Sequence, residues 1–257
     1  MVDPMIELKN LTKRYGKTLA VANLRLSVPE GVIFGFIGPN GAGKTTTIKM
    51  MGGLIAPDSG TVVINGTDMG RYPETAKQVI GFIPDRPYLY EKLTGMEFLK
   101  FTADLYGVGY ERFAHAADVM LDRFSLSDWK NELIEGYSHG MKQRLIMAAA
   151  ILHDPKVIIV DEPMVGLDPA GIRMVKELFK KLAAEGVSFF ISTHTLSIAQ
   201  DVCDRIGIIH KGRLIATGTL DDLKIQANAT EDDLEAVFLK ITREEELGLE
   251  AQKAGGT

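Results

Sequence analysis

An eight-residue glycine-rich segment, residues 38–45, constrains the fold of this chain more than any other part of the sequence. It reads Gly-Pro-Asn-Gly-Ala-Gly-Lys-Thr and directly follows an unbroken apolar run over residues 32–37. Such a run is typical of a strand covered on both faces, and a helical pattern follows from about Thr45 to Gly53. Glycines let successive backbone N–H groups curve around phosphates, and the helix N-terminus adds a partial positive charge. The segment therefore predicts a phosphate-binding loop between a strand and a helix.

The side chains of this loop suit a nucleoside triphosphate held together with a metal ion. Lys44 is expected to reach the β- and γ-phosphates and to assist catalysis, and the Thr45 hydroxyl is expected to bind Mg²⁺. The other positions are expected to contact the nucleotide: Gly38, Pro39, Asn40, Gly41, Ala42, Gly43 and Thr46. The alternative, a glycine turn without a ligand, is disfavoured by the flanking strand and helix. We therefore expect ATP and Mg²⁺ as cofactors.

A second candidate site lies at Asp161 and Glu162, which end an apolar run over residues 157–160. Ligands of parallel sheets collect at the carboxyl ends of the strands. Asp161 is expected to hold the magnesium ion, mostly through water, and Glu162 to act as the general base that polarises the attacking water. An isolated Asp-Glu pair would be interpreted as a solvated loop, but the phosphate loop upstream favours the catalytic interpretation.

The alternation of strand-like and helical segments predicts an α/β fold with a twisted, mainly parallel sheet. Turn signals at Gly16-Lys17, Asn65-Gly66 and Lys211-Gly212 predict three hairpins. Apolar residues recur at helical spacing from about residue 97 to residue 152, which indicates a helical insertion. A final amphipathic helix is expected to be capped by Thr230 and to carry apolar residues as far as Ile241.

Composition and charge narrow the classes of protein that this chain can belong to. The 257 residues carry a net charge of −5, which argues against general nucleic-acid binding. No signal peptide and no apolar run of membrane-spanning length is visible, so a partner would have to supply any membrane span. The single cysteine, Cys203, fits a reducing cytosolic setting and is expected to be a buried structural thiol.

The segment Tyr-Ser-His-Gly-Met-Lys-Gln-Arg, residues 137–144, narrows the choice among phosphate-loop enzymes. Physically it is a second helix start with a hydroxyl and a glycine, which can bind phosphate. In its position before Asp161 it resembles the signature motif of ATP-binding cassette (ABC) ATPases. That resemblance implies that Ser138 and Gly140 contact the γ-phosphate bound by a second chain, so that ATP is sandwiched between two subunits.

Further matches to this family extend over about residues 5–242. Tyr15 stands where the family stacks an aromatic ring on adenine, and Asp168 belongs to a Gly-Leu-Asp segment similar to the loop that crosses the dimer interface. His194 follows a predicted strand, as does the family's switch histidine, which contacts the γ-phosphate. Taken singly, these residues would be interpreted as an ordinary strand tyrosine, a helix cap and a polar surface histidine.

Two departures from the family pattern stand out. Asp85 replaces the usual glutamine, which contacts Mg²⁺ and the attacking water and links to the membrane subunit. A carboxylate can still bind magnesium through water, although it adds negative charge beside Glu162. The signature has His139 and Met141 in place of the commonest glycine and glutamine. This form resembles the branch whose ATPases energise separate six-span export-type permeases.

The resemblance implies one ABC ATPase domain over residues 1–257. Its expected parts are an ATP-binding core with an antiparallel β subdomain (residues 5–84 and 155–220), a helical signature subdomain (residues 86–154), and a C-terminal helix with a flexible acidic tail (residues 221–257). The chain is expected to dimerise around two ATP molecules, with an identical subunit or a close paralogue, and to drive a separate membrane permease. It would be cytoplasmic and peripheral on the inner face of the cell membrane.

Two alternatives remain at this stage. A soluble ABC ATPase that remodels another protein would have the same motifs without a permease. A GTPase or a small-molecule kinase would need a base-specificity motif or an acceptor pocket, and the sequence offers neither. For the transporter hypothesis, a helix of the permease is expected to dock near residues 85–101, with Tyr88 and Tyr90 as contacts.

Overall fold

The computed structural model describes residues 4–229 and 233–254, which build two sheets. The larger sheet has the order β10-β9-β3-β8-β7-β6; neighbouring strands are parallel except β10, which is antiparallel to β9. Its strands are β3 (Ile33–Ile37), β6 (Ile80–Ile83), β7 (Val157–Asp161), β8 (Ser188–Thr193), β9 (Arg205–His210) and β10 (Arg213–Gly218). The predicted α/β fold with a mainly parallel sheet is therefore confirmed.

The smaller sheet is antiparallel, with the order β2-β1-β4-β5. Its strands are β1 (Ile6–Tyr15), β2 (Thr18–Val28), β4 (Ser59–Ile64) and β5 (Thr67–Asp68). The turns that join β1 to β2, β4 to β5 and β9 to β10 lie at the three glycine-containing pairs that predicted hairpins. Asn65 and Lys211 both have positive φ angles, 46° each, which is the left-handed conformation that such tight turns require.

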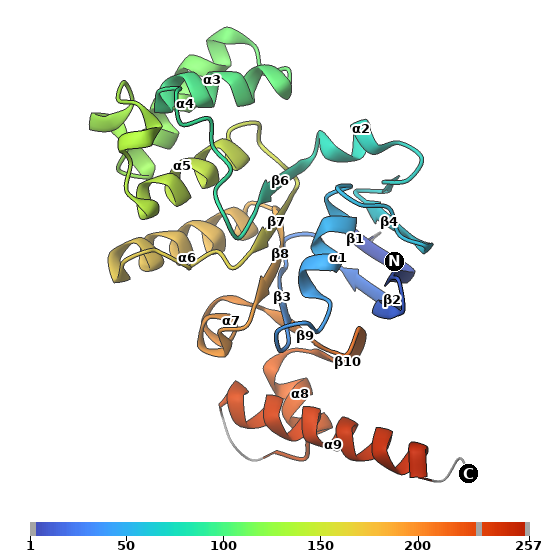
Figure 1. The fold of residues 1–257 in the computed structure, drawn as a ribbon. Coiled ribbons are helices and arrows are strands. Elements are labelled where there is room, and N and C mark those ends of the chain that lie inside the picture. Colours follow the sequence, from blue (N-terminus) through green and yellow to red (C-terminus); the bar gives the residue numbers. More distant parts are fainter. Residues whose placement is uncertain (1–3, 230–232, 255–257) are drawn as a thin grey trace.

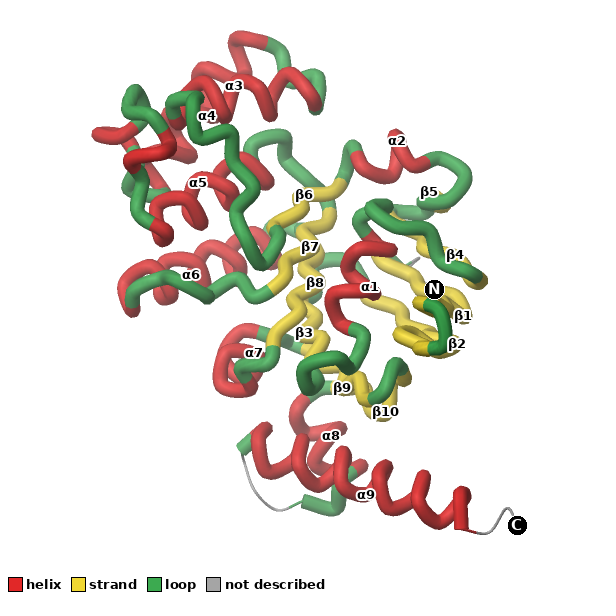
Figure 2. The backbone as a smooth tube through the Cα atoms, viewed as in Figure 1, coloured by secondary structure: helices red, strands yellow, loops and turns green. Residues whose placement is uncertain are grey.

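Helices lie on both sides of the larger sheet (Figure 2). Its central strands are buried because each face packs against a separate hydrophobic layer. Phe190 on β8 packs with Phe34 and Phe36 on β3, on the side of helix α1 (Lys44–Met51) and the antiparallel sheet. Its neighbour Phe189 points to the opposite face and packs against Phe179 of α6 (Pro169–Ala184). Successive side chains of a strand alternate between faces, so two covered faces demand a continuous apolar run.

The helical insertion contains α3 (Gly95–Leu105), α4 (Tyr110–Arg123) and α5 (His139–Ile151), and a short helix α2 (Pro73–Lys77) lies between β5 and β6 (Figure 1). Two 3₁₀ turns, Ser127–Trp129 and Ile134–Gly136, join α4 to α5. Leu99 and Leu145 of the insertion share one buried cluster with Ile158 of the sheet. The insertion is therefore packed onto the sheet through a common core.

The last part of the chain packs beside β9 and β10. Helix α7 (Leu196–Val202) precedes β9, and α8 (Leu220–Gln226) and α9 (Leu234–Ala254) follow β10. Leu234, Val237 and Ile241 of α9 are buried, as predicted. Helix α9 continues to Ala254, past the predicted apolar face that ends at Ile241, through a run rich in helix-forming residues. The predicted cap at Thr230 lies outside the described residues.

Cys203 follows α7 and turns its thiol toward β3. A Cβ atom placed on Gly35 would lie 2.7 Å from its Sγ atom. Burial raises the pKa of the Cys203 thiol to about 12, so this thiol is protonated and unreactive at neutral pH, as predicted. Among the helices of the described ranges, none combines the length and apolarity that a membrane crossing requires.

A partly buried histidine links the helical insertion to the sheet and makes stability depend on pH. The ring of His153 stacks on Tyr106 at 3.6 Å, and its Nε2 lies 3.2 Å from the carbonyl oxygen of Ile80. Burial lowers the pKa of His153 from 6.5 to about 4. Between these two values the unfolded chain binds a proton that the folded chain does not, so stability is lost as the pH falls through this window.

We expect His153→Gln to reduce the pH dependence of the free energy of unfolding between pH 6.5 and pH 4, because it removes the titrating group. Urea denaturation at several pH values would measure this. The same substitution at the exposed His115 is the control and should leave the slope as in the wild type. Equal slopes for His153→Gln and the wild type would contradict the prediction.

Candidate functional site

The glycine-rich loop joins β3 to α1, as the sequence predicts, and two neighbouring strands pack closely against it. A Cβ atom added to Gly38 would lie 2.3 Å from the carbonyl oxygen of Ile209, and one added to Gly43 would lie 2.4 Å from that of Ala20. Gly43 also has a φ angle of 111°, which side chains rarely tolerate. The loop therefore needs glycine at both positions to lie against β9 and β2.

Lys44 opens helix α1 and folds its side chain back across this loop. Its Nζ atom donates hydrogen bonds to the carbonyl oxygens of Gly38, at 2.7 Å, and Pro39, at 3.1 Å. The residue is only 8% exposed, and burial lowers the pKa of its ammonium group, while Glu162 and Asp161 oppose that shift. A cation held among carbonyl oxygens at a helix start is well placed to attract a phosphate.

Asp161 ends strand β7 and faces the start of α1. The Thr45 hydroxyl donates to its Oδ2 atom at 3.2 Å. Asp161 is 5% exposed, and its pKa is raised mainly by burial and in part by the Asp85 and Glu162 carboxylates nearby. These side chains offer hard oxygen ligands, which suit Mg²⁺. Among the described residues no three His, Cys, Asp or Glu side chains form a metal cage.

Glu162 is held in a defined orientation by the end of strand β8. Its Oε2 atom accepts a hydrogen bond from the Thr193 hydroxyl at 2.9 Å. Its Oε1 atom accepts one from the backbone N–H of His194 at 2.9 Å and lies 2.6 Å from the Nδ1 atom of His194. The φ angle of Glu162 is 50°, an uncommon backbone conformation for this residue type that is often found at functional sites. Sequence reasoning missed Thr193, because a threonine at a strand end carries no signal of its own.

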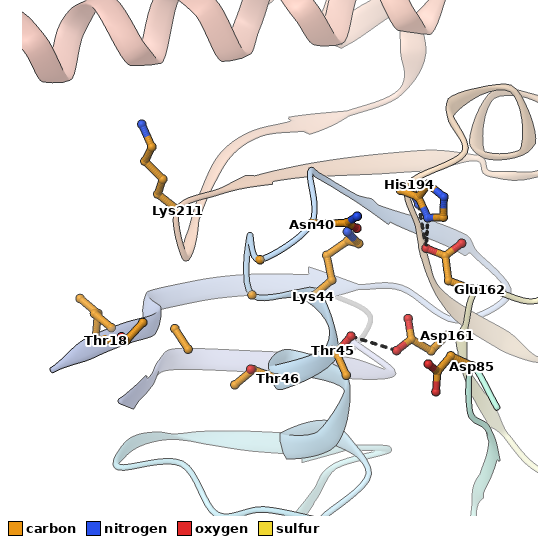
Figure 3. A pocket seen from close by; sticks show the side chains of 14 residues that line it. Thr18, Asn40, Lys44, Thr45, Thr46, Asp85, Asp161, Glu162, His194 and Lys211 are labelled. Atoms are coloured by element: carbon orange, nitrogen blue, oxygen red, sulfur yellow. Dashed lines mark hydrogen bonds and ion pairs between the residues drawn. The ribbon is translucent and has the colours of Figure 1, made fainter. Parts of the chain in front are cut away.

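These groups surround one cavity of about 560 Å³ (Figure 3). Most of its lining was predicted: Asn40, Gly41, Gly43, Lys44, Thr45, Thr46, Asp85, Asp161, Glu162 and His194. Sequence reasoning missed four further lining residues, Thr18, Leu19, Ala20 and Lys211. They lie on β2 and on the β9–β10 turn, so only the packing of those strands against the loop brings them to the cavity.

Four predicted residues outside the glycine-rich loop do not line this cavity. The Tyr15 ring is half exposed, and its centroid lies 5.9 Å from the Nζ atom of Lys13. Tyr15 is close to the cavity, because it is the strand partner of the lining residue Thr18. Ser138 and Asp168 cap helices α5 and α6, where their side chains accept hydrogen bonds from the backbone at 3.2 and 2.8 Å. Gly140 lies beside the turn at residues 166–168, since an added Cβ atom would be 3.2 Å from the carbonyl oxygen of Gly166.

Gly38, described above, and Pro39 and Ala42 belong to the loop without lining the cavity. Pro39 accepts the Lys44 hydrogen bond described above, and Ala42 is buried. The carbonyl oxygen of Ala42 accepts a hydrogen bond from the backbone N–H of Gly212 at 2.9 Å. Both residues therefore shape and anchor the loop through the backbone.

Comparison with known proteins identifies relatives along most of the chain. The family described as ABC transporter matches residues 21–165. The linearmycin resistance ATP-binding protein LnrL of Bacillus subtilis (strain 168) is 39% identical, over 85% of this chain and 70% of the relative. The bacitracin transport ATP-binding protein BcrA of Enterococcus faecalis is 41% identical, over 87% of this chain and 72% of the relative.

A solved structure agrees with the fold. The structure described as the ATP-binding subunit of an ABC transporter superposes with a TM-score of 0.88 at 35% sequence identity. The match covers 93% of this chain and 99% of that one.

We expect Gly38→Ala to weaken ATP binding at least about tenfold, because the added methyl group would push the loop away from β9 and misalign its N–H groups. Titration with a fluorescent ATP analogue would measure this. Gly136→Ala is the matched control, since a Cβ atom there meets nothing within 4 Å. Wild-type affinity in the Gly38→Ala protein would show that the close contact does not shape the site.

Proposed function

The chain belongs to the ABC transporter family of ATP-binding, ATP-hydrolysing subunits, and on this premise we propose that two copies close around two ATP molecules to drive a separate membrane permease. One observation supports the dimer: the two helix starts proposed to bind phosphate, those of α1 and α5, do not share a cavity. The helix start at Lys44 lines the cavity, whereas Ser138 and Gly140 do not. A second subunit would bring its own Ser138 and Gly140 over the first subunit's cavity.

Within each site, the loop over residues 38–46 would surround the phosphates, with Lys44 binding the β- and γ-phosphates. Tyr15 would pack on the adenine ring from the neighbouring strand end. Asp168 would contact the second subunit beside the site. In this arrangement the helical part, residues 86–154, carries Ser138 and Gly140, and the core over residues 5–84 and 155–220 carries the loop and the catalytic groups.

Thr45, Asp161 and Asp85 would hold Mg²⁺, directly or through water, and the ion would neutralise charge on the phosphates. Glu162 would accept the proton of the attacking water, since its carboxylate is already oriented by Thr193. His194 would contact the γ-phosphate. Its Nδ1 atom lies 2.6 Å from the Oε1 atom of Glu162, so His194 would also help to orient the general base.

A groove beside the cavity supports the permease as a partner. It measures about 490 Å³, and Leu54, Phe82, Arg86 and Tyr88 are among its lining residues. Asp85 lines both this groove and the cavity, so a helix docked in the groove would touch the residue next to the metal site. Asp85 would therefore link docking of the permease to hydrolysis.

The relatives support export as the direction of transport. One of them is named for resistance to linearmycin and another for bacitracin transport. Resistance to a toxic compound is what export would produce. The chain would then act at the inner face of the cell membrane, on the cytoplasmic side.

We expect the purified Glu162→Gln protein to form a dimer with ATP and Mg²⁺, because it binds ATP but cannot activate water to release it. Light scattering should give twice the 28.2 kDa mass of the chain. The variant that also carries Lys44→Ala is the control and should stay monomeric. A Glu162→Gln protein that binds ATP and remains a monomer would contradict closure between identical subunits.

Affinity purification from detergent-solubilised membranes should recover a multi-span protein with this chain. Tyr88 is 78% exposed at the groove, so Tyr88→Ala should lower that recovery several-fold without changing ATP affinity. Tyr110→Ala, at an exposed tyrosine that does not line the groove, is the matched control. Recovery of soluble proteins alone would favour an ATPase that remodels a non-transport partner.

A further inference from the structure

The turn between β9 and β10 is fixed directly to the phosphate loop. The backbone N–H of Gly212 donates to the carbonyl oxygen of Ala42 at 2.9 Å, and the carbonyl oxygen of Gly212 accepts from the N–H of Ala22 at 2.8 Å. Gly212 has a φ angle of 80°, and a Cβ atom there would lie 2.9 Å from the carbonyl oxygen of Ala20. The residue before it, Lys211, therefore has a set position relative to the loop and to β2.

Lys211 lines the cavity but points its ammonium group elsewhere. In Figure 3 its side chain extends from the tip of the turn and away from Lys44. Its Nζ atom lies 3.6 Å from the Oε1 atom of Glu246 on α9. The same Glu246 oxygen lies 3.5 Å from the Nε2 atom of His210, a buried residue whose ring nitrogens have no hydrogen-bond partner within the described residues. Glu246 on α9 thus faces the turn and is the acidic partner of Lys211.

This ion pair can exchange partners readily. The Lys211 side chain is 60% exposed and that of Glu246 is 52% exposed, and ion pairs between exposed groups contribute little to stability. Lysine carries its charge on a flexible four-carbon stem, so the Lys211 ammonium can turn toward a ligand while its backbone stays fixed. A polyphosphate in the cavity offers several negative charges where Glu246 offers one.

The position of Lys211 also indicates which part of the nucleotide it would meet. Thr18 and Lys211 lie at one end of the cavity, and Glu162 and His194 lie at the other, with the phosphate loop between them (Figure 3). Glu162 and His194 serve the terminal phosphate in the proposed mechanism. Lys211 therefore lies nearer to the α-phosphate and the nucleoside, the part that ATP and ADP share, than to the terminal phosphate.

We propose that Lys211 is an additional nucleotide-binding residue, and that Glu246 of α9 competes with the nucleotide for its ammonium group. The occupied site would then release Glu246, so that the C-terminal helix responds to nucleotide binding. The inference rests on the binding of ATP at the phosphate loop and adds a residue and a competitor to that site.

A double-mutant cycle on the full chain tests both parts, with ATP and ADP titrated separately in the absence of Mg²⁺. We expect Lys211→Ala to weaken both nucleotides by about tenfold, as loss of a charge-assisted contact would. Glu246→Gln should tighten both by about two- to fivefold, as release of an exposed ion pair would. In the Lys211→Ala protein, Glu246→Gln should have no further effect, because the group it competes for is gone.

The controls change the same charges elsewhere. Lys180→Ala on α6 and Glu244→Gln on α9 affect exposed side chains that do not line the cavity, and both should bind like the wild type. Thermal melts of all variants should match, which separates binding from folding.

The outcomes separate the inference from the proposed function. A wild-type protein that fails to bind ATP would contradict the function itself. Three results would overturn the inference while leaving the function intact. Lys211→Ala could bind both nucleotides with wild-type affinity, or it could weaken ATP alone. Glu246→Gln could raise nucleotide affinity by the same factor with and without Lys211.

Discussion

Burial of the central strands on both faces is the constraint on which the site depends. Side chains of β3, β7 and β8 must be apolar along the strand, because each face packs against a hydrophobic layer. Charged groups can therefore stand only where these strands end, and the carboxyl ends of parallel strands meet at one edge. Lys44, Asp161, Glu162 and His194 all follow or end one of these strands. The same packing that stabilises the sheet thus gathers the reactive groups.

The charges at that edge explain why the site suits a phosphate with a cation. The carboxylates of Asp85 and Glu162 lie close to Asp161 and contribute to its raised pKa. A bound cation would relieve this repulsion. Lys44 is desolvated nearby, and its charge is neutralised best by an anion. The family usually has a neutral glutamine at position 85, so Asp85 adds a negative charge that a cation would neutralise. Asp85 also lines both the groove and the cavity.

Much of the fold could be predicted from local sequence patterns, because burial of a strand and formation of a tight turn depend on residues that are close in sequence. Apolar runs predicted the buried strands, and the glycine-containing turns predicted the three hairpins. Local patterns failed where packing decides. Thr193 and Lys211 reach the site through the ends of β8 and β9, and nothing in their immediate sequence distinguishes them.

The sequence by itself determined the phosphate loop, the carboxylate pair after β7 and the second helix start at Ser138, since each depends on residue type and spacing within a few positions. Only the tertiary structure decided which of these groups share a cavity. It brings Lys44, Asp161 and Glu162 together because β3 and β7 lie on either side of β8 in one sheet, and it leaves Ser138 outside the lining of that cavity. It also brings Lys211 to the cavity, since the β9–β10 turn is hydrogen-bonded to the loop. Strand order, which short sequence patterns do not encode, is the physical reason for the difference.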